Sequence, residues 1–195
     1  FEKGMSFIKK IVMDLQKYLG EASREKLCSF HEYLHDSQDL AVFLDNQIFC
    51  ITNDSERKEA EDRFNKELDI DSFQKANVLV WLLGDQDAHL NNFRLVTKNL
   101  DDGSVVHFIK KIDNGLTLPQ KHTYIRNYLA YFSGRKNPLS EELTNTVMDI
   151  SKESLRPLIE SCYLEESWSC LKERIDLLQE LVSRNLSVEE IHMRM

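Results

Sequence analysis

The sequence predicts a mainly helical α+β fold, in which one short β-hairpin interrupts a series of helices. Only 6 glycines and 3 prolines occur among the 195 residues, so few positions break regular structure. Apolar residues recur at helical spacing along most of the chain. The pair Asp102-Gly103 separates two runs rich in β-branched and aromatic residues, which is a hairpin signal.

Helices in the first half of the chain are expected over residues 5–18, 23–35, 40–49, 55–68 and 72–83. The last of these is apolar nearly all round between Ala76 and Leu83, which is typical of a buried helix. Gly84 follows it, and glycine suits the left-handed residue that ends many helices. We therefore expect a buried helix, with Trp81 in the core, that ends at Gly84 and is followed by a polar loop.

The hairpin strands are expected over residues 93–96 and 105–109. After Pro119, helices are expected over residues 124–132, 140–150, 154–162, 166–184 and 188–193. Ser140 and Ser187 are suited to be N-caps, and Glu190 completes a capping box with Ser187.

Composition excludes several classes of partner. The formal charge from 25 basic and 33 acidic side chains is −8, whereas a nucleic-acid-binding protein needs a basic surface. No apolar run approaches the about 20 residues that cross a bilayer, so no transmembrane segment is expected.

The four cysteines have no Cys-x-x-Cys spacing, so we expect reduced thiols in a cytoplasmic protein. Because the chain begins with Phe1 and has no initiator Met, we expect a fragment, a processed product or the ordered part of a longer protein.

Three polar residues stand in the loop after the buried helix and at the end of the hairpin. Asp87 and Asn92 are five positions apart, and Asp113 precedes Asn114-Gly115. ATP-dependent phosphoryl transfer needs a carboxylate that orients and deprotonates the attacking hydroxyl, and oxygen ligands that hold Mg²⁺ against the triphosphate. We expect Asp87 to be that carboxylate, and Asn92 and Asp113 to be the metal ligands, because the hairpin returns the chain to the loop.

Other interpretations of the neighbouring residues compete with this one. Asp85 is a candidate third acidic ligand, but capping the turn or pairing with a neighbouring base is favoured. For His89, a hydrogen bond to the loop backbone is favoured over metal ligation, and Asp85, Asp87 and His89 lack the closed tetrahedral set of a zinc site. Residues 31–35, His-Glu-Tyr-Leu-His, match a zinc-protease pattern, but Asp36 follows where such helices prefer uncharged residues, so ordinary helix histidines are favoured.

Two segments resemble known kinases. Residues 112–122, Ile-Asp-Asn-Gly-Leu-Thr-Leu-Pro-Gln-Lys-His, resemble the start of the activation segment of type II phosphatidylinositol 4-kinases. The spacing from Asp87 to Asn92 is similar to the catalytic loop of phosphatidylinositol 3/4-kinases generally. Residues 83–93, Leu-Gly-Asp-Gln-Asp-Ala-His-Leu-Asn-Asn-Phe, resemble the catalytic loop of HipA-type serine/threonine kinases.

The resemblance implies a protein-kinase-like large (C-terminal) lobe and a role for each matching residue. Asp87 would be the catalytic base, Asn92 and Asp113 the Mg²⁺ ligands, and His89 a loop-shaping residue, all four lying at the Mg-ATP site. Residues 1–70 would form the helical region of the lobe or the region preceding it. Residues 71–122 would form the catalytic core, and residues 123–195 the C-terminal helical part.

The chain departs from these kinases in two respects. It has no glycine-rich phosphate loop and no β-rich small lobe, so we expect the small lobe upstream in the same protein and the isolated chain to be inactive. The cysteine-rich insert of type II lipid kinases has no counterpart either.

We therefore expect an ATP- and Mg²⁺-dependent kinase that is phosphatidylinositol 3/4-kinase-like. Its substrate would be a phosphoinositide lipid, which residues 112–122 favour, or a protein hydroxyl, which residues 83–93 favour. A pseudokinase or interaction module is the non-enzymatic alternative. The expected location is the cytoplasm. A membrane surface is an alternative, as is the host cytosol if the protein is a secreted effector.

Overall fold

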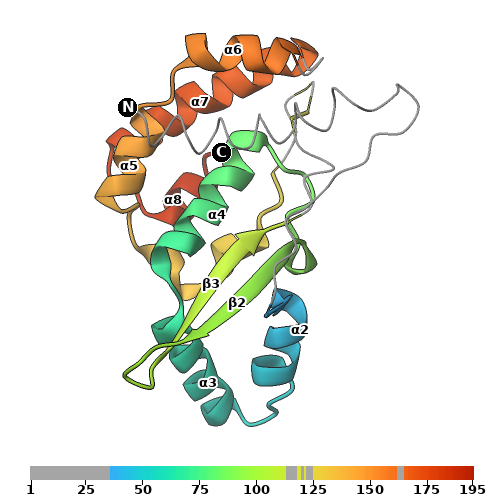
Figure 1. Ribbon diagram of the computed structural model, residues 1–195, viewed down its shortest axis with the longest axis vertical. Helices are drawn as coiled ribbons and strands as arrows, with labels where there is room; N and C mark the ends of the chain where they lie inside the picture. Colours follow the sequence, from blue (N-terminus) through green and yellow to red (C-terminus); the bar gives the residue numbers. More distant parts are fainter. Residues whose placement is uncertain (1–35, 113–117, 120, 122–124, 162–164) are drawn as a thin grey trace, which may run out of the picture.

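The computed structural model describes residues 36–112, 118–119, 121, 125–161 and 165–195 (Figure 1). These residues are mainly helical and contain a three-stranded antiparallel sheet, which confirms the α+β class. The helices expected over residues 5–18 and 23–35, including the His-Glu-Tyr-Leu-His motif, lie outside the described residues.

The elements follow one another along the chain in an order close to the expected one. The strands are β1 (Ser37–Asp39), β2 (Phe93–Asn99) and β3 (Val105–Lys111). The α-helices are α2 (Leu40–Leu44), α3 (Asp54–Glu67), α4 (Ile70–Leu83), α5 (Glu141–Met148), α6 (Lys152–Ser161), α7 (Trp168–Ser183) and α8 (Val188–His192). A π-helical turn, η1 (Asp45–Phe49), extends α2, and 3-10 turns occur at η2 (Leu90–Asn92), η3 (Tyr128–Tyr131), η4 (Ser133–Lys136) and η5 (Glu165–Ser167).

Helix α4 lies at the centre of the fold. It contacts β3 on one side and α7 on the other, with α2 and α3 near one end of the molecule and α6 near the opposite end (Figure 1). Trp81 and Phe73 on α4 are fully buried, as is Phe93 on β2. Burial of each phenylalanine contributes about 1.5–3 kcal/mol to stability. The prediction of a buried helix with Trp81 in the core is therefore confirmed.

The hairpin is confirmed and is longer than expected. Strands β2 and β3 pair in register from Phe93 opposite Lys111 to Asn99 opposite Val105. A third strand, β1, was not predicted, because three residues are too few to show a period-2 pattern. Its position on β2 is fixed by Arg94, which pairs with the Asp39 carboxylate at 2.6 Å and donates to the Ser37 carbonyl at 2.6 Å.

The capping predictions are confirmed. The Ser140 side chain accepts from the backbone N–H of Leu143, and Ser187 forms a capping box with Glu190. The prediction of a helix over residues 124–132 is wrong for the part described, where a single 3-10 turn follows an extended Asn127.

A buried asparagine pair explains why that segment is not helical. Asn127 and Asn77 are 2% and 0% exposed, and Asn127 Nδ2 donates to Asn77 Oδ1 at 2.7 Å. Asn77 in turn donates to the Phe73 carbonyl at 2.8 Å, while Asn127 Oδ1 accepts from Leu129 N–H at 3.2 Å. This network joins α4 to the η3 segment, and the tertiary bonds outweigh the weak helical preference of the local sequence.

Replacing Asn127 with alanine should lower the free energy of unfolding by about 1–3 kcal/mol, because Asn77 Oδ1 would lose its donor in a buried site. Urea denaturation measures this loss. Asn137→Ala, at an exposed position ten residues further along, should change stability by less than about 0.5 kcal/mol. Equal losses in the two variants would contradict the structural role of the pair.

Candidate functional site

The loop of residues 84–92 begins where α4 ends. Gly84 adopts φ 63° and ψ 42°, the left-handed conformation expected of a residue that ends a helix. A Cβ atom at this position would lie 2.6 Å from Cζ of Arg174, which reaches the site from α7. Gly84 therefore serves two needs, the sharp turn and the close approach of a guanidinium group.

Arg174 caps the C-terminal end of α4. Its Nε donates to the Leu82 carbonyl at 3.2 Å, and a positive charge at the C-terminal end of a helix is favourable. The residue is 6% exposed, and this burial lowers the pKa of Arg174. Its Nη2 atom is buried and has no hydrogen-bond partner in the described part of the chain.

Asp85 holds the start of the 84–92 loop. Its carboxylate pairs with Nζ of Lys111 at 2.8 Å, and the two side chains are 2% and 3% exposed. Asp85 Oδ1 also accepts from the backbone N–H of Asp87 at 2.8 Å. The favoured interpretation, in which Asp85 caps the turn or pairs with a neighbouring base, is confirmed, and Asp85 does both.

Asn92 closes the same loop onto itself. Its Nδ2 donates to the Asp87 carbonyl at 2.7 Å, although the two residues are five positions apart. The side chain of Asn92 is nearly buried, whereas that of Asp87 is 47% exposed. The loop therefore combines a fixed amide with a carboxylate that is accessible from solvent.

Asp113, the third expected site residue, lies outside the described residues, as do Asn114 and Gly115. Described residues on either side of this stretch are placed by backbone hydrogen bonds to the last residue of the 84–92 loop and to the residue just before the loop. Ile112 N–H donates to the Asn92 carbonyl at 2.9 Å, and Leu118 N–H donates to the Leu83 carbonyl at 2.7 Å.

His89 does not form the side-chain hydrogen bond to the loop backbone that was favoured for it. Its Nδ1 is buried without a partner among the described residues, and its Nε2 lies 3.6 Å from Oδ2 of Asp87. The backbone of His89 contributes to the shape of the loop, since its N–H donates to the Asp87 carbonyl at 2.8 Å and its carbonyl accepts from Asn92 N–H at 2.9 Å.

The chemistry of Asn92 fits a magnesium ligand. Because its amide nitrogen is used by the Asp87 carbonyl, the orientation of the side chain is fixed and Oδ1 is left as an acceptor. Amide and carboxylate oxygens are ligands that Mg²⁺ prefers. The described residues contain no group of three or more His, Cys, Asp or Glu side chains able to hold a metal ion.

Lys111 and Arg174 are site residues that the sequence analysis missed, although each carries a signal in the sequence. Lys111 is four and two positions from His107 and Ile109 on the inward face of β3. Arg174 is three and four positions from Leu171 and Leu178 on the buried face of α7. A basic residue in phase with apolar residues of a buried face indicates a buried charge that needs a partner.

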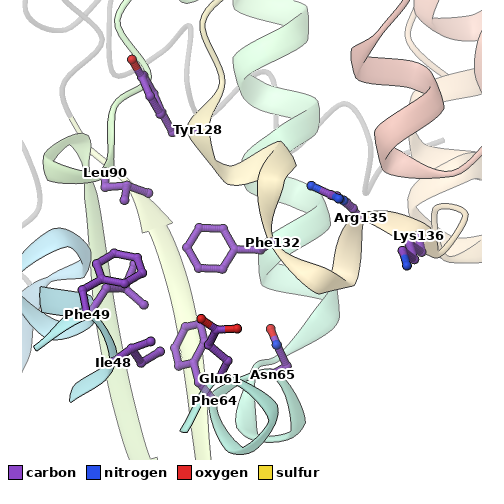
Figure 2. Close-up of a pocket in the computed structure, with 11 residues that line it drawn as sticks. Ile48, Phe49, Glu61, Phe64, Asn65, Leu90, Tyr128, Phe132, Arg135 and Lys136 are labelled. Carbon is purple, nitrogen blue, oxygen red and sulfur yellow. The ribbon is translucent and has the colours of Figure 1, made fainter. Parts of the chain in front are cut away.

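A pocket of about 460 Å³ opens beside the 84–92 loop (Figure 2). It lies between η1 and α3 on one side and the η3 and η4 turns on the other, and its lining includes Leu90 from the loop. Most of the lining side chains are apolar or aromatic, and Arg135, Lys136 and Glu61 carry charges.

Comparison with known proteins gives no family for this chain. No protein-family model matches it, and no curated protein matches its sequence. Within the described residues, no helix has the length and apolar character that spanning a membrane requires.

Replacing Lys111 with methionine should lower the free energy of unfolding by about 3–5 kcal/mol, because the Asp85 carboxylate would stay buried without its cation. Chemical denaturation measures the loss. Lys110→Met, at the exposed neighbouring position of β3, is the matched control and should have little effect.

Adding Asp85→Asn to Lys111→Met should restore much of the lost stability, because asparagine removes the unpaired charge and still accepts from Asp87 N–H. An equal loss for the Lys110 and Lys111 variants would contradict the role of the ion pair.

Proposed function

We propose that this chain is the large lobe of an ATP- and Mg²⁺-dependent kinase that transfers a phosphoryl group to a hydroxyl. The observation that carries the proposal is the closed 84–92 loop, in which Asn92 holds the Asp87 carbonyl while the Asp87 carboxylate remains accessible. The backbone bond from Ile112 to Asn92 supports it, because it brings the residue before Asp113 to the same loop.

The proposed reaction assigns one task to each of these side chains. Asp87 orients the acceptor hydroxyl and takes its proton as the hydroxyl oxygen bonds to the γ-phosphorus and the bond from that phosphorus to ADP breaks. Asn92, through Oδ1, and Asp113 would hold Mg²⁺, which when bound neutralises the charge that develops on the phosphate oxygens. The buried pair of Asp85 and Lys111 holds Asp87 in place through its backbone N–H.

The structural plan around the loop is consistent with this proposal. A buried helix precedes the loop, an antiparallel hairpin follows it, and the hairpin ends at the Asp-Asn-Gly run. The resemblance of residues 112–122 to type II phosphatidylinositol 4-kinases and of residues 83–93 to HipA-type kinases supports the same chemistry. A small lobe of the same protein would supply the remaining contacts to ATP.

Asp87→Asn should reduce phosphoryl transfer by about 10²- to 10⁴-fold, because the loop would keep its shape but lose its base. The assay follows label from the γ-phosphate of ATP into phosphoinositide vesicles or into lysate protein, using the longest natural form of the protein. Asp113→Asn should lose a comparable factor, with loss of Mg²⁺ binding.

The control is Asp101→Asn, the same chemical change in the exposed turn of the hairpin. It should leave the rate unchanged. Thermal unfolding of each variant checks that the fold is kept. Full activity in folded Asp87→Asn protein would refute the assignment, and binding of Mg-ATP without transfer in any arm would indicate a pseudokinase.

A further inference from the structure

We propose that the pocket beside the 84–92 loop is an acceptor subsite for an extended peptide. It would take one bulky apolar side chain of the peptide and direct an acidic residue to the end formed by Arg135 and Lys136. The inference rests on the proposed kinase function and names the substrate class of that site.

The pocket is close to the proposed base. Leu90, which lines it, is three residues after Asp87, and three residues span at most about 11 Å. Tyr128, another lining residue, donates from its backbone N–H to the carbonyl of Ala88, the residue next to Asp87, at 3.3 Å. Two of the pocket's segments are therefore attached to the loop that holds Asp87.

The distance between the pocket and Asp87 is one that an extended peptide can span. An extended chain rises about 3.3 Å per residue, so about two to four residues would connect a side chain in the pocket to a hydroxyl at Asp87. The volume of about 460 Å³ leaves room for a large aliphatic or aromatic side chain.

The lining is suited to an apolar group. Phe49 and Tyr128 present aromatic surface at the pocket, since they are 54% and 47% exposed. Phe64 and Ile48 are buried members of the lining. Figure 2 shows Phe132 between the apolar side and the side that carries Arg135 and Lys136. Aromatic side chains at the rim of a pocket are frequent sources of binding energy in protein recognition.

The two basic side chains of the lining lie at one end of the pocket. Figure 2 shows Arg135 and Lys136 on the side opposite Leu90 and Phe49. Arg135 lies 3.4 Å from Glu189, and Lys136 is exposed. This basic end of the pocket would attract an acidic residue of the peptide.

The same arrangement argues against two other occupants. The phosphates of a nucleotide would be drawn to Arg135 and Lys136, on the side away from the 84–92 loop, where Asp87 could not act on them. A polyanionic lipid headgroup would meet the Glu61 carboxylate in the lining and the negative charge of the whole chain.

The test uses the full chain and fluorescein-labelled peptides with a central serine. A leucine is placed about two to four residues from the serine, with a glutamate beyond it. Fluorescence polarisation without ATP measures binding, so the readout does not depend on catalysis. A matched set with alanine in place of leucine should bind about tenfold more weakly.

Phe49→Ser should weaken binding of the leucine peptides about tenfold, and Leu100→Ser, at a 46% exposed position in the hairpin turn, should not. Lys136→Glu should weaken binding of the peptides that carry glutamate. It should not weaken binding of peptides in which that glutamate is replaced by lysine. All three replaced side chains lie at the surface, so the variants are expected to fold.

The outcomes of the binding and phosphorylation assays distinguish failure of the peptide subsite from failure of the kinase proposal. Peptide binding that depends on Phe49, with no label transferred to the serine, to lysate protein or to phosphoinositide vesicles by the longest natural form of the protein, supports the subsite and refutes the kinase proposal. Phosphorylation that is the same in Phe49→Ser and Leu100→Ser protein refutes the subsite alone. Phe49-dependent binding of phosphatidylinositol vesicles without peptide binding, or no binding by any peptide, also overturns the inference.

Discussion

The arrangement of the candidate site depends on one buried ion pair, Asp85 with Lys111. Both side chains are almost completely removed from water, and charges in such a place are tolerated only when they are paired and hydrogen-bonded. The pair joins the end of α4 to the end of β3, two segments that are far apart in the chain. Asp85 also accepts from Asp87 N–H and Lys111 donates to the Ile112 carbonyl, so the pair fixes the start of the 84–92 loop and the end of the hairpin together.

Within the 84–92 loop and its surroundings, the buried polar side chains and the exposed Asp87 have different roles. Arg174, Asp85 and Asn92 are buried and hold backbone groups, whereas Asp87 extends into solvent. A reactive side chain is useful only when its position is fixed by neighbours that do not themselves react. The proposed base is therefore presented by a loop whose shape is maintained by buried polar groups, and the pocket begins on that loop at Leu90.

Periodicity predicted the parts of the fold whose neighbours in sequence are also their neighbours in the structure. The hairpin around Asp102-Gly103, the buried helix that ends at Gly84 and the capping box at Ser187 are local patterns, and all three are found. Strand β1 was missed because its three residues owe their conformation to pairing with β2. The prediction of a helix over residues 124–132 was wrong for the described part, because the buried hydrogen bond from Asn127 to Asn77 stabilises a different backbone.

For the candidate site, the sequence alone determined the residue types and spacing that indicate phosphoryl transfer, together with the hairpin that returns the chain to the loop. It also favoured capping of the turn or pairing with a neighbouring base over metal ligation for Asp85. Only the tertiary structure decided that the partner is Lys111, that Arg174 closes the end of α4, and that a pocket opens beside Leu90. The physical reason is that local patterns report which face of an element is buried, whereas the partner of a buried charge depends on which distant element packs against that face.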